Sequence, residues 1–69
     1  MIEIFKTNVQ ETAESQEIVR RLLEHFPLGQ ITFDLEDCDK VLRVEHSDVC
    51  SETIKSVLSF FGYRCEELE

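Results

Sequence analysis

Apolar and polar residues alternate with a period of two in the middle of the chain. In the stretch Gln30–Glu36 every second residue is apolar, and these residues are Ile31, Phe33 and Leu35. Alternation of this kind is typical of a strand that buries one face. The stretch Lys40–Glu45 repeats the pattern after a short polar turn. The two stretches therefore predict a β-hairpin.

Both ends of the chain also favour strands. The stretch Met1–Val9 is rich in β-branched and aromatic residues, which are enriched in strands. Its neighbours Ile4 and Phe5 are both apolar, so the pattern leaves open which of the two faces the core. The stretch Tyr63–Leu68 predicts a short last strand at an edge of the sheet.

Two segments change to a helical period, in which apolar residues recur every three or four positions. The first predicted helix spans Gln10–Phe26 and ends before Pro27 and Gly29. Its apolar stripe consists of Ile18, Val19, Leu22, Leu23 and Phe26. The second predicted helix spans Ser51–Phe61 and ends at Gly62. Its stripe consists of Ile54, Val57, Leu58 and Phe61.

The predicted order of elements is strand, helix, strand, strand, helix, strand within one continuous domain, residues 1–69. No linker, repeat or low-complexity segment interrupts it. This order is the signature of the ferredoxin-like βαββαβ sandwich. We therefore expect an α+β fold in which two helices cover one face of a four-stranded antiparallel sheet.

The charge of the chain restricts the partners that the protein can bind. The chain carries 15 acidic and 7 basic residues, a formal net charge of −8. Nucleic acids and anionic membranes would be repelled, whereas a cationic protein surface would be attracted. The N-terminus shows no signal-peptide pattern and no apolar run has the length of a membrane span. The sequence thus predicts a cytoplasmic protein without nucleic-acid or membrane partners.

The residues at the ends of the two predicted helices resemble those of a known family. The first predicted helix closes with FPLG at 26–29, and the second runs through the pattern IxxVLxxFGY at 54–63. Together with the order of elements, these features resemble the heavy-metal-associated (HMA) domain family, the module of copper chaperones and of metal-pumping ATPases. The resemblance covers nearly the whole chain and implies the ferredoxin-like fold. Packing and capping residues carry it, so it says little about activity.

The metal motif of that family is missing. HMA domains bind a soft ion such as Cu(I) through a Met-x-Cys-x-x-Cys loop before the first helix, because soft metals select thiolates. The resemblance places Thr12 and Ser15 at the two cysteine positions. Neither is a soft ligand, so we expect no metal there and no other cofactor. Asn8, Thr12 or Ser15 is instead expected to cap the helix.

The three cysteines form no Cys-x-x-Cys pair. The topology puts Cys38 in the hairpin turn, at the end where the metal loop would lie, and Cys50 at the opposite end. Cys65 is expected to pack inward as a small apolar residue. Cys38 is therefore the predicted exposed thiol. A Cu or Zn carrier that uses these non-standard cysteines remains the alternative function.

Other chemistry-bearing residues give weaker signals. Glu36, Asp37 and Asp39 at the hairpin tip predict a solvated turn, which would hold a hard cation only weakly. His25 and His46 have no Cys or Asp at ligand spacing, so a helix-end or solvent role is expected. No nucleophile, histidine and acid form a catalytic pattern. We predict that the protein is not an enzyme, and keep a small enzyme or an enzyme subunit as a third hypothesis.

A contact surface is the remaining prediction. Phe60 adjoins Phe61 and cannot share its inward direction, so Phe60 is expected to be exposed. With Tyr63, Thr12 and Glu14 it makes a candidate surface beside the former metal loop, although single exposed apolar residues are ordinary. The sequence therefore predicts a metal-free domain that acts by contact with a protein partner. Charged residues on the last strand disfavour self-pairing and predict a monomer.

Overall fold

The computed structural model describes residues 1–68 and contains six elements. In chain order they are β1 (Ile2–Thr7), α1 (Thr12–His25), β2 (Gln30–Asp34), β3 (Val41–Glu45), α2 (Ser51–Phe60) and β4 (Cys65–Leu68). All six predicted elements are present, and their ends differ from the predicted ones by no more than two residues. No helix in the described part of the chain is long and apolar enough to cross a bilayer.

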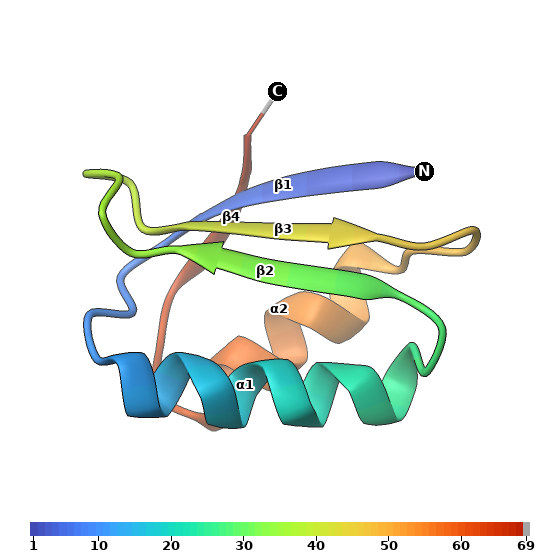
Figure 1. The fold of residues 1–69 in the computed structure, drawn as a ribbon, viewed down its shortest axis with the longest axis horizontal. Helices are drawn as coiled ribbons and strands as arrows, with labels where there is room; N and C mark the ends of the chain where they lie inside the picture. The colour runs from blue at the N-terminus through green and yellow to red at the C-terminus, as the bar shows by residue number, and fades with distance from the viewer. Residues whose placement is uncertain (69) are drawn as a thin grey trace.

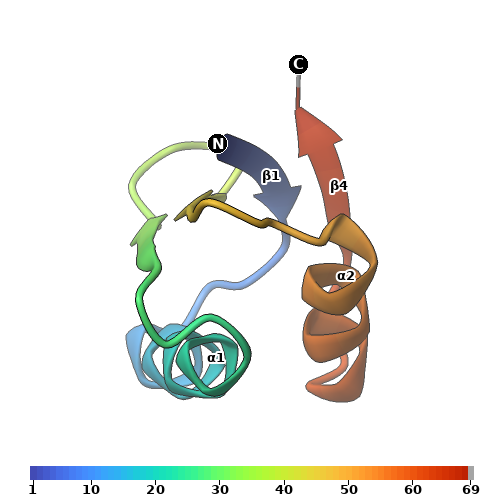
Figure 2. The ribbon, with the colours of Figure 1, turned by 90° about the vertical axis from the view of Figure 1, so that its right-hand side faces the viewer.

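The four strands form one antiparallel sheet in the order β2-β3-β1-β4. Both helices lie on the same side of this sheet, and they run next to each other beneath it (Figures 1 and 2). The other side of the sheet has no helix over it. This arrangement confirms the predicted α+β ferredoxin-like fold.

The core lies between the sheet and the two helices. Phe5 and Thr7 on β1 are buried, whereas Ile4, the residue before Phe5, is 38% exposed on the open side of the sheet. Phe5 rather than Ile4 therefore faces inward. The residues of the buried apolar cluster are Phe5, Val9, Ile18, Leu22, Phe26, Leu42, Val44, Ile54, Val57 and Leu58.

The buried stripe of α1 is narrower than the sequence predicts. Ile18, Leu22 and Phe26 are buried and Val19 is half-buried, but Leu23 is 38% exposed. The prediction that Leu23 belongs to the core face was wrong. Adjacent residues of a helix point about 100° apart, so Leu23 turns away from the sheet when Leu22 points directly at it.

None of the predicted residues caps the start of α1, so that prediction was also wrong. The N-cap position is Glu11, and no side chain there bonds to the first turn of the helix. The Asn8 Oδ1 atom accepts a hydrogen bond from the Arg64 backbone N–H at 2.8 Å instead. The Ser15 hydroxyl donates to the Thr12 carbonyl at 2.7 Å. Asn8 and Ser15 thus use their side chains for a tertiary and an intrahelical hydrogen bond, and neither caps the helix.

The β2–β3 turn is bonded to the end of β1. The Thr7 N–H donates to the Asp39 carbonyl at 3.0 Å, and the Thr7 hydroxyl donates to the Lys40 carbonyl at 2.6 Å. The Lys6 ammonium lies 3.7 Å from the Asp39 carboxylate. The turn that carries Cys38 is thus held at the end of the sheet from which the chain enters α1, as predicted.

Gly62 ends α2 as predicted. Its φ of +87° lies in the left-handed region, which residues other than glycine rarely adopt. The Gly62 N–H donates to the Ser59 carbonyl and the Tyr63 N–H to the Leu58 carbonyl, both at 2.9 Å. These bonds use the last carbonyls of the helix. They also direct Tyr63 back towards the core, against which it packs.

Candidate contact groove between the two helices

Thr12 and Ser15, which the predicted resemblance places at the metal-ligand positions, offer no site for a soft ion. Thr12 is exposed at the first position of α1, whereas Ser15 is only 6% exposed. The Ser15 hydroxyl is already bonded to the Thr12 carbonyl within the helix. Two hydroxyls, one of them buried and bonded, do not fit the donor set that Cu(I) requires.

Tyr63 and Glu14, two of the predicted contact residues, come together beside the start of α1. Both side chains are half-buried. Burial raises the pKa of the Tyr63 phenol above its usual value, and the negative charges of Glu14 and Glu11 raise it further. The acidic side chains around Tyr63 make this part of the surface negative.

Phe60, at the last position of α2, is 76% exposed, as predicted. Its ring packs edge-on against Phe61, with the ring centroids 5.5 Å apart. On the other side, the Arg21 guanidinium carbon of α1 lies 5.6 Å from the centroid of the Phe60 ring. This distance is within the range of a cation–π interaction, so Phe60 has a neighbour on each helix.

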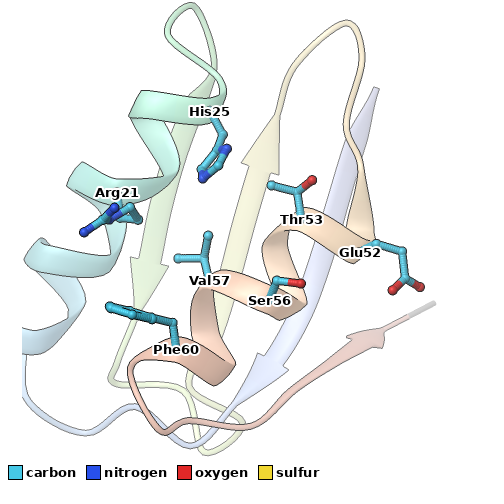
Figure 3. Close-up of a pocket in the computed structure, with 7 residues that line it drawn as sticks. All are labelled: Arg21, His25, Glu52, Thr53, Ser56, Val57 and Phe60. Atoms are coloured by element: carbon cyan, nitrogen blue, oxygen red, sulfur yellow. The ribbon is translucent and has the colours of Figure 1, made fainter.

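A groove of about 410 Å³ extends from Phe60 between the two helices. Arg21 and His25 line it on α1, and α2 contributes Glu52, Thr53, Ser56, Val57 and Phe60. In Figure 3, His25, Val57 and Phe60 point into the space between the helices. The lining combines an apolar part with a few polar groups, which is the composition of most binding grooves.

The charge of the groove differs from that of the whole molecule. Arg21 is a cation in a chain of net charge −8, and it belongs to none of the salt bridges found among residues 1–68. Its neighbour Arg20, by contrast, lies 3.2 Å from the Glu17 carboxylate. The only carboxylate in the lining is that of Glu52, which Figure 3 shows directed away from Arg21.

Sequence reasoning missed most of this groove. It identified Phe60 and placed His25 at the end of the first helix, but Arg21 was not among the predicted contact residues. The available signal was the spacing of Arg21 and His25, since residues four apart lie on one face of a helix. Thr53 and Val57 repeat that spacing on the second helix. Whether these two helix faces meet depends on how α1 and α2 pack. The spacing of residues within each helix gives no information on that packing.

The three thiols do not converge. Cys38 and Cys50 are exposed, and Cys65 is half-buried against the core as predicted. Within residues 1–68, one group of three ligating side chains lies close enough to hold a metal, with ligand atoms within 4.8 Å of one another. It consists of Asp37, Cys38 and Asp39, so it contains a single sulfur.

Cys50 differs from Cys38 in its surroundings. It occupies the N-cap position of α2. Hydrogen bonding with the Thr53 side chain, and also with the backbone of Thr53 and Glu52, holds the pKa of the Cys50 thiol below its usual value. A lower thiol pKa gives more thiolate at neutral pH and hence faster reaction. Cys50 is therefore a second exposed thiol beside Cys38, and its lowered pKa favours the thiolate form.

Comparisons with known proteins add no family. Neither the models of protein families, nor the curated proteins, nor the solved structures contain a match to this chain. The resemblance to the HMA family therefore stays a prediction, and the groove and the thiols are the features of the chain from which a function can be proposed.

Proposed function

We propose that this domain acts by binding another protein, without catalysis and without a metal, and that the groove between α1 and α2 is its binding site. One observation carries the proposal. Phe60 is largely exposed and lines the groove, yet its ring packs against both Phe61 and Arg21. An aromatic side chain that is held in place before binding loses little freedom on binding, which is why such residues dominate contact energies.

The chemistry of the groove supports binding rather than catalysis. Its reactive groups are the imidazole of His25, the hydroxyls of Thr53 and Ser56, and the carboxylate of Glu52. Among the side-chain hydrogen bonds of residues 1–68, none joins the imidazole or the carboxylate to either hydroxyl. A nucleophile needs such a base within hydrogen-bond reach. The residues present therefore suit recognition better than group transfer.

Replacing Phe60 should remove binding while the fold persists. Peptides selected from a random display library on the wild-type domain are expected to bind Phe60→Ala at least about tenfold more weakly, because truncation of an aromatic anchor costs about 2 kcal/mol or more. Fluorescence polarisation measures the affinities. Leu28→Ala is the matched control, since Leu28 is 91% exposed and lies outside the groove lining. Selected peptides that bind Phe60→Ala as well as wild type would show that the groove is not the site.

The metal-carrier alternative predicts a different result. It is favoured by the cluster of Asp37, Cys38 and Asp39. A single thiolate with two exposed carboxylates is a poor site for Cu(I), which prefers several sulfur ligands. We therefore expect no stoichiometric binding of Cu(I) or Zn(II) tighter than micromolar when the reduced protein is titrated against a chelator. Tight binding that Cys38→Ser abolishes would overturn the metal-free proposal.

A further inference from the structure

We infer that the groove binds a protein segment in which an acidic residue adjoins a bulky apolar one. The apolar side chain packs on Phe60 and Val57, and the carboxylate is held by Arg21 with His25. This inference rests on the proposed function, because it names the chemistry of the segment that the groove receives.

The apolar contact is provided by α2. Val57 is 6% exposed, while Phe60 three residues later is mostly exposed. Residues three apart are neighbours on one helix face, so a partner side chain placed between the helices contacts both. The position is large enough for a leucine or an aromatic ring, since the whole groove has a volume of about 410 Å³.

The polar contact is provided mainly by α1. Arg21 stands over the Phe60 ring, so an apolar group on that ring lies next to the guanidinium. Arg21 makes no salt bridge within residues 1–68, so its charge is available to a partner. A carboxylate can accept two parallel hydrogen bonds from a guanidinium. His25, four residues along the same face, and the hydroxyls of Thr53 and Ser56 are further donors in the lining.

The negative charge of the molecule does not prevent this contact. At physiological ionic strength the Debye length is about 8 Å, so acidic groups farther than that from the groove are largely screened. The nearby charges then decide, and in the lining these are Arg21 and Glu52, of which the Glu52 carboxylate is directed away from Arg21 (Figure 3). A partner can thus have a cationic surface, as the net charge favours, and still insert an acidic residue here.

Matched peptides test the charge preference. We use short peptides with a central Leu-Phe pair flanked by Glu, by Gln or by Lys, and titrate each into the isotopically labelled full chain. The Glu peptide is expected to shift the amide resonances of Thr53, Ser56, Val57 and Phe60. It should bind about fivefold more tightly than the Gln peptide, which is the effect of a partly exposed ion pair worth about 1 kcal/mol.

Two arginine variants assign the preference to one side chain. Arg21→Gln should bind the Glu and Gln peptides equally, whereas Arg20→Gln removes the same charge one residue away and should keep the preference. If the Lys peptide binds the groove best, or if Arg21→Gln keeps the preference for Glu, this inference is wrong while the groove remains a protein site. If all three peptides shift resonances only outside the groove, both proposals fail.

Discussion

Phe5→Ala is expected to remove most or all of the stability of the domain. Phe5 is fully buried on β1, where it pairs with Leu42 of β3 and Glu67 of β4. Truncating a buried phenylalanine costs about 3–5 kcal/mol. A domain of this length has a total unfolding free energy of about 3–10 kcal/mol. Urea denaturation followed by circular dichroism should therefore show a large fall in midpoint, or an unfolded protein without urea.

The neighbouring position supplies the control. Ile4→Ala changes the next residue of the same strand, but its side chain lies on the open face and is partly exposed. We expect a smaller loss of about 1–2 kcal/mol, because Ile4 is 38% exposed whereas Phe5 is fully buried. If Phe5→Ala does not fold, Phe5→Leu gives a measurable midpoint for the same comparison. A larger loss for Ile4→Ala than for the Phe5 variants would mean that β1 has the opposite face inward.

This pair of residues also marks how far the sequence determines the fold. The hairpin could be predicted because Ile31, Phe33 and Leu35 alternate strictly with polar residues, and alternation fixes which face is buried. On β1, the adjacent Ile4 and Phe5 break the alternation, so the pattern alone could not decide. The sheet decides it, because β1 lies between β3 and β4 and Phe5 meets the helices.

Helix ends and the groove were harder to predict for a different reason. Asn8 is a favourable capping residue, but its side chain bonds to the backbone of Arg64, which is distant in the sequence. The groove likewise requires Arg21 of one helix and Phe60 of the other to come within 5.6 Å. Local patterns predict each helix and its buried stripe. They contain no information on which exposed residues of two separate helices become neighbours.

The thiol of Cys65 is expected to react far more slowly in the folded protein than in the unfolded chain. Burial raises the pKa of the Cys65 thiol from the usual 9.0 to about 11, while the positive charge of Lys55 opposes the shift and Glu67 and Glu66 add to it. Two units of pKa reduce the thiolate fraction at neutral pH about 100-fold, and the thiolate is the reactive species. In a variant with Cys38→Ser and Cys50→Ser, iodoacetamide should therefore alkylate the native chain about 100-fold more slowly than the urea-unfolded chain.

The same shift makes stability depend on pH, with a sign that can be checked. The folded state keeps the Cys65 proton up to about pH 11, whereas the unfolded chain loses it near pH 9. The stabilisation is thus complete below pH 9 and is lost as the pH rises towards 11. Urea midpoints of wild type and Cys65→Ala should converge over that interval, because only the wild type carries this thiol. Parallel midpoints across it, together with native alkylation as fast as in urea, would show that the core does not shield this thiol.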